Sequence, residues 1–430
     1  MTLSFRPSFS QEASRWLYSG LLLVLSPIVV MALFILAIKK KQQGRFRIRE
    51  RFGFGSPSLR QGGYLFHCVS VGEVVSASSL IKLLMDEQPA LTITITTTTP
   101  TGADRVKALF GNRVQHLFLP YDLPFLMSGL LNRLSPQKVI ITEVELWPNM
   151  IHTCWRKRIP VCVLNARMTE KSAKRYSKYP RLFGAMLQKV THVCAQGERD
   201  YNNYLSLGVH TDKLTLTNNI KFDQANELLR ASTSSFKGLD AGQRAIFVAG
   251  STHEPEESLI LAALQAIPAD IRPLLILVPR HPERFDTVAA LLSQQSLPWC
   301  RSTEVDVIPE NTAIVLLDEM GQLTRAYAIA TVAFVGGSLA NKGGHNALEP
   351  AAMSLPVLMG PHTYNNPVIC QTLIEAKALR IVRDSEALTH ALTGLLQDPD
   401  AARAQGQAGK QVLLSNQGAV AKSLAIIEQL

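Results

Sequence analysis

The sequence predicts an α/β fold in which two facing Rossmann-like domains follow one N-terminal transmembrane helix. Three features lead to this prediction. A long uncharged stretch lies near the start, short aliphatic runs alternate with longer amphipathic ones after residue 60, and a small, polar segment divides that alternation in two. Aliphatic strands without polar alternation, joined by helices, indicate parallel sheets that are buried on both faces.

The uncharged stretch runs from Trp16 to Ile38. As a helix it would be about 34 Å long, enough to cross a bilayer core of about 30 Å. Positive charges crowd residues 39–51, which marks that side as cytoplasmic and adds attraction to anionic phospholipid. A cleaved signal peptide would instead carry its charge before the apolar stretch. We therefore expect residues 1–51 to be a membrane anchor with the remaining chain on the cytoplasmic side.

The aliphatic runs give the expected strands. They lie at residues 64–69, 91–95, 138–142, 160–164 and 192–195 in the first half, and at 245–249, 274–278, 313–317, 332–335 and 356–359 in the second. The small, polar segment 231–242 is the expected linker, so the predicted domains are 52–230 and 231–430, the latter with a terminal helix. Open α/β sheets bind ligands at the carboxyl ends of their strands, where we expect the site.

Charge and cysteine content restrict the function. The formal charge of +10 suits an anionic partner: nucleic acid, phospholipid, or a phosphorylated or carboxylated substrate. The basic stretch 171–181, interleaved with aromatic residues, could face a membrane, a phosphate or only solvent. Six scattered cysteines favour buried free thiols and a reducing compartment. The sequence contains no H-E-x-x-H, C-x-x-C, G-x-S-x-G or G-x-x-x-x-G-K motif, which argues against metalloprotease, zinc and Walker-type sites.

Two segments of the second half are candidates for holding a phosphate. Residues 334–352 have the pattern of a strand, a glycine-rich loop and a helix start, where free backbone N–H groups favour an anion; Asn346 and Glu349 lie near the first turn. Arg280 follows another strand and can form a bidentate pair with phosphate. The alternative for the loop is a tight turn with a helix cap. The neighbouring His281, flanked by prolines, could act in catalysis or have only a structural role.

Carboxylates follow the strands of the first half. Glu73 lies at the helix start after strand 64–69, where the helix dipole favours its charged form and burial opposes it. Glu143 and Glu145 follow a later strand and share one face, and Lys221, at the end of another strand, is a cation that could neutralise them. The alternatives are an acidic residue that serves only its own helix, and a structural ion pair.

Eight short motifs occur in order along almost the whole chain. They are S-V-G-E (70–73), P-T-G (100–102), T-E-V-E-L-W-P-N (142–149), N-A-R (165–167), K-F-D (221–223), S-T-H-E (251–254), V-P-R-H-P (278–282) and G-G-H-N (343–346). Together they resemble the Kdo (3-deoxy-D-manno-octulosonic acid) transferases of lipid A biosynthesis. The resemblance implies a GT-B fold and transfer of Kdo, with inversion, from CMP-Kdo to the tetraacyl lipid A precursor, lipid IVA, at the inner membrane. It implies no metal, no other cofactor and no nucleic-acid partner.

The resemblance also implies roles for particular residues. Glu73 matches the general base, and Glu143 and Lys221 match residues that assist the transition state. The residues that match CMP-binding segments are Pro279, Arg280, Met320, Gly321, Gln322, Asn346, Ala347, Leu348 and Glu349. Three positions depart from the family pattern: Ala347 replaces a frequent proline, Gln322 a common glutamate, and Asn218-Asn219 a glycine-containing turn. Two other functions remain open: a UDP-sugar transferase or epimerase with the same fold, and a membrane-tethered binding protein without activity.

Overall fold

The computed structural model describes residues 5–39, 47–53, 59–229, 235–240 and 244–430. Contacts divide the chain into two units, Met1–Ile220 with Gly418–Leu430, and Lys221–Gln417. The predicted linker lies partly outside the described residues; its remainder includes the short antiparallel strands β8 (Ser235–Phe236) and β9 (Leu239–Asp240). The boundary therefore precedes the predicted one, because helix α10 (Ile220–Leu229) already places Phe222 and Ala225 in a core of the second unit.

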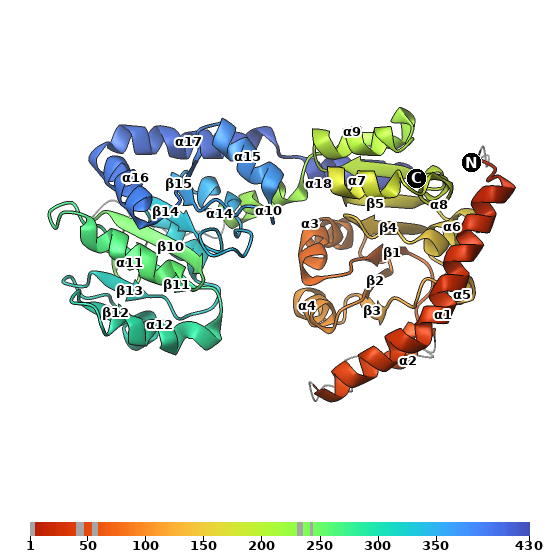
Figure 1. The fold of residues 1–430 in the computed structure, drawn as a ribbon, viewed down its shortest axis with the longest axis horizontal. Coiled ribbons are helices and arrows are strands. Elements are labelled where there is room, and N and C mark those ends of the chain that lie inside the picture. The colour runs from red at the N-terminus through yellow and green to blue at the C-terminus, as the bar shows by residue number, and fades with distance from the viewer. Residues whose placement is uncertain (1–4, 40–46, 54–58, 230–234, 241–243) are drawn as a thin grey trace. The chain divides into compact units, whose positions relative to one another are not determined.

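The first unit is a parallel sheet with helices on both faces (Figure 1). Within the described residues the strand order is β3-β2-β1-β4-β5-β6-β7. The strands are β1 (Tyr64–His67), β2 (Ile93–Thr97), β3 (Gln115–Phe118), β4 (Lys138–Thr142), β5 (Val161–Ala166), β6 (His192–Ala195) and β7 (Leu214–Leu216). The helices are α1 (Phe9–Lys39), α2 (Ile48–Arg51), α3 (Val71–Glu87), α4 (Pro100–Phe110), α5 (Pro124–Leu134), α6 (Pro148–Arg156), α7 (Glu170–Tyr176), α8 (Pro180–Gln188), α9 (Glu198–Ser206) and α18 (Ala419–Gln429).

Alternating side chains of β1 fill two cores of this unit. Phe66 packs in a cluster with residues of α3 and α18, whereas Leu65 packs in a cluster with residues of α5 and α6. The terminal helix α18 belongs to this unit and not to the predicted second domain, because Leu424 and Ile427 are buried in the same cluster as Leu80 of α3. All six cysteines, which lie in the described part of the chain, are free, and all but Cys300 are buried, as predicted.

The second unit repeats the architecture. Over the described residues its parallel sheet has the order β12-β13-β11-β10-β14-β15-β16. The strands are β10 (Ile246–Thr252), β11 (Leu274–Pro279), β12 (Trp299–Arg301), β13 (Ile314–Leu316), β14 (Val332–Val335), β15 (Val357–Met359) and β16 (Leu379–Ile381). The helices, besides α10, are α11 (Glu256–Ala266), α12 (Phe285–Leu292), α13 (Leu323–Ala328), α14 (Leu348–Ala352), α15 (Pro367–Glu375), α16 (Ser385–Gln397) and α17 (Pro399–Ser415). The α/β fold with two parallel sheets is thus confirmed.

The predicted membrane-spanning helix is not supported. Among the residues described, the structure contains no helix with the length and apolarity needed to cross a membrane. The start of α1 instead packs on the first unit: Arg15 Nη1 donates to Asn149 Oδ1 (3.0 Å), and the Tyr18 hydroxyl donates to Asp122 Oδ2 (3.1 Å). These two hydrogen bonds attach the first turns of α1 to residues of the sheet domain in the first unit. Of the predicted basic segment, residues 40–46 lie outside the described residues.

Asp122 joins α1 to α6, and its replacement by Ala is expected to destabilise the first unit by about 2–4 kcal/mol. The buried carboxylate accepts the N–H groups of Asn149 and Met150 at the start of α6 (2.9 and 2.8 Å) as well as the Tyr18 hydroxyl. A buried donor without a partner costs about 1–3 kcal/mol. Urea unfolding measures the loss. Tyr18→Phe, which removes only the bond to α1, should cost about 1 kcal/mol; equal losses in the two variants would contradict this account.

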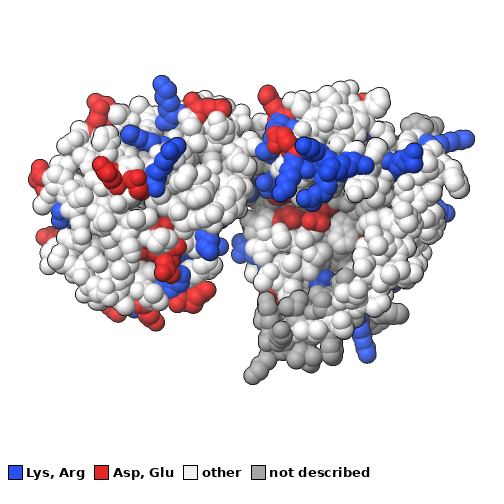
Figure 2. Space-filling model, in the orientation of Figure 1, with Lys and Arg blue, Asp and Glu red and all other residues white. Residues whose placement is uncertain are grey.

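The basic stretch 171–181 is a solvent-facing surface. Lys171, Lys174, Arg175, Lys178 and Arg181 are all exposed, on and around α7 and the start of α8. Figure 2 shows Lys and Arg side chains gathered in the region of α7. Exposure fits both a solvated helix and a surface for an anionic partner, so the predicted anionic partner stays a prediction.

Candidate active site

Glu73 and Glu143 follow adjacent strands at the point where the strand order of the first sheet reverses. Glu73 follows β1 and Glu143 follows β4, and these two strands pair in parallel. Helix α3 begins at Val71, so Glu73 lies in its first turn. Because ligands of open α/β sheets bind outside the carboxyl ends of strands at such a reversal, the fold places both predicted carboxylates in a ligand-binding position.

Glu73 is buried but hydrogen-bonded. Its Oε2 accepts the backbone N–H of Val69 (2.7 Å), its Oε1 accepts the Ser70 hydroxyl (3.3 Å), and the residue is 8% exposed. Burial raises the pKa of Glu73 to about 8, and the negative charges of Glu143 and Glu145 add to that rise, whereas the two hydrogen bonds oppose it. Burial is thus the largest influence on the pKa of Glu73. A carboxyl group with a pKa this close to neutrality is suited to exchange a proton with a substrate.

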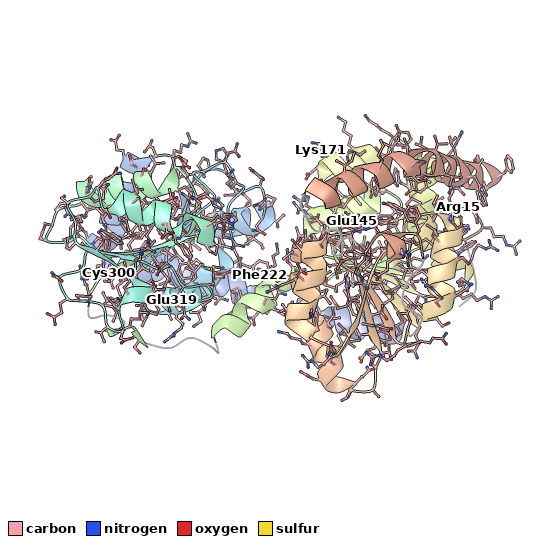
Figure 3. All side chains as sticks on the ribbon, turned by 90° about the horizontal axis from the view of Figure 1, so that it is seen from below. Arg15, Glu145, Lys171, Phe222, Cys300 and Glu319 are labelled. Carbon is pink, nitrogen blue, oxygen red and sulfur yellow. The ribbon has the colours of Figure 1, made fainter. Side chains whose placement is uncertain are left out.

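Glu143 has a strained backbone. Its φ of 62° lies in the left-handed region, which costs a residue other than glycine roughly 1–3 kcal/mol. The strain is held by the sheet, because the N–H of Glu143 donates to Leu164 O (2.9 Å) and its carbonyl accepts from Arg167 N (3.3 Å). Glu145, labelled in Figure 3, accepts from Trp147 Nε1 (3.1 Å). Because backbone strain of this kind is concentrated at functional sites, the conformation of Glu143 supports a functional role for this turn.

The candidate nucleotide-binding residues of the second unit also lie after neighbouring strands. Strand β11 ends at Pro279 and is followed by Arg280. After β13 come Met320, Gly321 and Gln322. The connection from β14 into α14 contains Asn346, Ala347, Leu348 and Glu349. All these strands are parallel members of one sheet in the order β13-β11-β10-β14, so their carboxyl ends share one edge. The fold therefore brings the predicted segments to the same edge.

The side chains of these segments differ in what they offer to a ligand. Arg280 and Met320 are exposed, whereas the side chains of Ala347 and Leu348 are fully buried, so that only their backbone can contact a ligand. Glu349 Oε1 accepts from Asn346 Nδ2 (3.2 Å). Burial raises the pKa of Glu349, although that hydrogen bond and the charge of Arg280 oppose the rise.

The glycine-rich loop after β14 already binds a carboxylate from the protein itself. The backbone N–H groups of Gly337, Ser338, Leu339 and Ala340 donate to the side chain of Glu256 at 2.7–3.1 Å. Leu348 N, at the start of α14, donates to Asn346 Oδ1 (3.2 Å). The backbone N–H groups of residues 337–340 are therefore occupied by Glu256, whereas phosphate binding at the helix start near Asn346 stays a prediction. A Cβ atom at residue 336 would lie 2.4 Å from Ser251 O. Glycine is needed at this position because the backbone of β10 passes so close.

Lys221 occupies a different element from the one predicted. It lies in the first turn of α10, at the start of the second unit, and its Nζ donates to Asn366 Oδ1 (2.7 Å). Glu143 belongs to the first unit, so the pairing of Lys221 with the acidic turn stays a prediction. The described residues contain no group of three or more His, Cys, Asp and Glu side chains that could hold a metal ion.

Sequence comparison gives close relatives over nearly the full length. The family model described as 3-deoxy-D-manno-octulosonic-acid transferase (kdotransferase) matches residues 46–224. The chain is 39% identical to the 3-deoxy-D-manno-octulosonic acid transferase of Haemophilus influenzae, over 96% of this chain and 98% of that protein. It is 31% identical to the Bordetella pertussis protein of the same name, over 96% and 99%.

Structure comparison supports the fold. The crystal structure of MurG from Acinetobacter baumannii aligns with a TM-score of 0.56 at 11% identity, over 86% of this chain and 100% of that one. At this identity the similarity shows the fold alone, which is a GT-B-like α/β fold.

Proposed function

Because the chain belongs to the 3-deoxy-D-manno-octulosonic acid (Kdo) transferase family, whose members are glycosyltransferases, we propose that it transfers Kdo from CMP-Kdo to lipid IVA with inversion at the anomeric carbon. The observation that carries this proposal is the environment of Glu73. A buried carboxyl group with a pKa raised to about 8 follows one strand, and the strained Glu143 follows the next, at the ligand-binding edge of the first sheet. A general base works best when its pKa lies near the working pH.

In the proposed reaction, ionised Glu73 takes the proton from an acceptor sugar hydroxyl as that oxygen attacks the anomeric carbon of Kdo. The bond between that carbon and the phosphate oxygen breaks, and CMP leaves with the electron pair. Arg280 and the segment from Asn346 to Glu349 hold the nucleotide. Glu143 and Lys221 stabilise the charge that develops in the transition state. The donor is a substrate, and the reaction proposed here uses neither a metal nor another cofactor.

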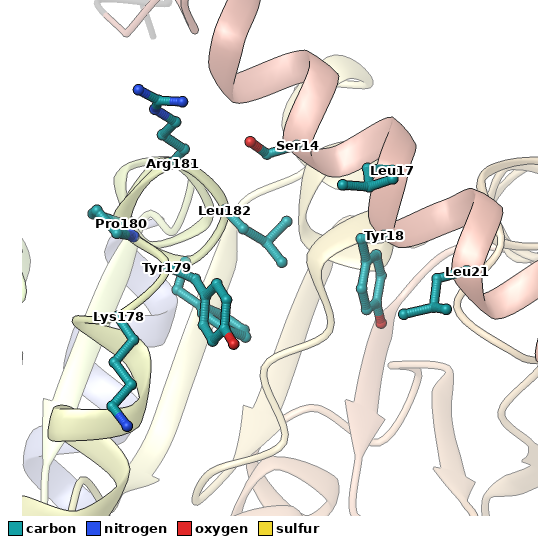
Figure 4. A pocket seen from close by; sticks show the side chains of 10 residues that line it. Ser14, Leu17, Tyr18, Leu21, Lys178, Tyr179, Pro180, Arg181 and Leu182 are labelled. Carbon is teal, nitrogen blue, oxygen red and sulfur yellow. The ribbon is translucent and has the colours of Figure 1, made fainter.

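We place the reaction at the cytoplasmic face of the inner membrane, where the enzyme lies on anionic phospholipid. Helix α1 exposes a series of large apolar side chains: Phe9, Trp16, Leu17, Leu21, Leu23, Val24, Leu25, Ile28, Met31 and Ile35. Between α1 and the start of α8 lies a cavity of about 610 Å³, with Tyr18, Leu21 and Leu182 among its walls and Lys178 and Arg181 beside them (Figure 4). An amphipathic surface that combines apolar and basic side chains is typical of proteins that lie on a membrane.

The release of CMP from CMP-Kdo in the presence of lipid IVA tests the proposal. We expect release to require both substrates and the product to carry Kdo. Competition between CMP and UDP for the purified protein identifies the nucleotide: tighter binding of UDP would assign the chain to a UDP-sugar reaction. Binding of CMP-Kdo without any turnover would instead assign it to the class of binding proteins.

A further inference from the structure

Three histidines lie together at the carboxyl edge of the second sheet. His253 follows β10, His281 follows β11 and His345 follows β14, and these are neighbouring strands in the order β11-β10-β14. The rings of His253 and His345 are nearly parallel, with an interplanar angle of 6° and centroids 5.1 Å apart, and the ring of His281 meets that of His253 edge-on at 5.2 Å. The three imidazole rings therefore come from three separate loops and contact one another at this edge of the sheet.

The contact between His253 and His345 restricts which ring nitrogens can carry a hydrogen. Their Nε2 atoms lie 2.8 Å apart, so one Nε2 carries a hydrogen and donates it while the other accepts. Two Nε2–H groups would repel each other at this distance. At most one of the two Nε2 atoms therefore carries a hydrogen, and burial with neighbouring positive charge, which lowers the pKa of His345 to about 4 and also lowers the pKa of His253, favours the neutral form of both rings.

Charged groups surround the three rings from several loops. The cations are Arg280, Arg284 and Lys342, and the acids are Glu256, Glu257 and Glu283. Glu257 is occupied by a two-point ion pair with Arg284 (2.5 and 3.1 Å), and Glu256 accepts the backbone N–H groups of the glycine loop. Glu283 Oε1 lies 3.8 Å from His281 Nδ1. Because Glu256 and Glu257 are engaged by these donors, the positive charges of Lys342 near His253 and of Arg280 near His345 favour an incoming anion.

We propose that His253, His281 and His345 bind an anionic oxygen of the sugar-nucleotide donor, and that the cluster takes up one proton from solvent when that oxygen binds. The incoming charge stabilises an imidazolium, the Nε2–Nε2 hydrogen bond opens, and both Nε2–H groups donate to the anion. The oxygen belongs either to the phosphoryl group or to the sugar carboxylate. The inference rests on the proposed function, since Arg280 and Asn346, proposed to hold the nucleotide, are the chain neighbours of His281 and His345.

Calorimetric titration of the full-length protein tests the proposal. CMP-Kdo is titrated at pH 6, 7 and 8, each in two buffers that differ in ionisation enthalpy, so that the protons taken up are counted. We expect uptake of about one proton, and an affinity that falls by up to about tenfold per pH unit as the pH rises, because the bound form is the protonated one. Cytidine, which has no anionic group, should show neither effect.

Variants separate the cluster from other titrating groups. His253→Gln and His345→Gln should remove the proton uptake and flatten the pH dependence, whereas His390→Gln, an exposed histidine on α16 of the same unit, should keep both. Circular dichroism checks that each variant is folded. Free Kdo and CMP distinguish the two oxygens. CMP itself titrates in this range, because the second pKa of a phosphate monoester is about 6. The proton uptake on CMP binding is therefore taken as the difference between the native protein and His253→Gln.

Two failures can be told apart. If CMP-Kdo binds with the same affinity from pH 6 to 8 and no proton is taken up, the histidine inference is wrong while the proposed transferase reaction stands. If CMP-Kdo does not bind and UDP does, the proposed donor itself is wrong.

Discussion

Replacement of Glu73 by Gln is expected to lower turnover by about 10²–10⁴ while making the protein more stable at neutral and alkaline pH. The loss of rate is the usual contribution of a well-placed general base. The amide keeps the shape of the side chain and can still accept the Val69 N–H, but it cannot take a proton from the acceptor hydroxyl. CMP binding should survive, because the residues proposed for it lie in the other unit.

The gain in stability follows from the raised pKa. Glutamate ionises near 4.5 in the unfolded chain and near 8 in the folded protein, so the folded protein holds a proton that the unfolded chain releases between these values. The stability that the protonated carboxyl contributes is complete below pH 4.5 and is lost as the pH rises through 8. Each unit of pKa difference corresponds to about 1.4 kcal/mol, so the Gln variant should be more stable by a few kcal/mol at pH 8.5.

Urea unfolding at pH 5 and pH 8.5 measures this difference, and the rate of CMP release measures the activity. Glu87→Gln, an exposed glutamate on the same helix, is the matched control and should change neither quantity. In the native enzyme kcat, measured at saturating CMP-Kdo, should increase with pH, reach half of its plateau near pH 8 and level off above that value. A Gln variant that keeps its activity, or that gains no stability at high pH, would remove Glu73 from the role of base.

The buried strands could be predicted from sequence, and the sheet edges could not. The predicted runs at 138–142 and 274–278 lie in β4 and β11, because a strand covered on both faces must be aliphatic throughout. The strands β3, β12 and β16 were not predicted. Each is an outer strand of its sheet and contains polar residues such as Gln115, Arg301 and Arg380, so it lacks the aliphatic signature.

The candidate site shows a similar division between local and long-range information. Glu73 could be found because it follows a buried strand, but the direction of its pKa shift depends on the depth of burial, which the sequence does not contain. Glu256 could not be found. A glutamate in the first turn of a helix is an ordinary residue, and only the folded chain shows that its carboxylate contacts the loop at residues 337–340.

The second large effect is expected at Glu256, the buried carboxylate under the glycine-rich loop. Its two oxygens accept the backbone N–H of His253 (2.9 Å) and the four N–H groups of the loop. Glu256→Ala leaves these donors without an acceptor in a buried place. At about 1–3 kcal/mol for each unsatisfied donor, with partial relaxation, we expect a loss of about 3–5 kcal/mol in the free energy of unfolding.

Glu256→Ala is also expected to affect function, because Glu256 holds the shape of the glycine-rich loop. The loop joins β14 to the segment that begins at Asn346, so its disorder should weaken CMP binding although Glu256 itself touches no proposed ligand atom. Hydrogen exchange in residues 336–341 should accelerate in Glu256→Ala and stay unchanged in Glu254→Gln, an exposed neighbour. Glu256→Gln should fall between them, since donors approach both carboxylate oxygens and an amide can accept on only one side. Unchanged loop exchange in the Ala variant would mean that the glycine-rich loop holds its shape without the carboxylate, and its backbone amides would again be candidates for binding phosphate.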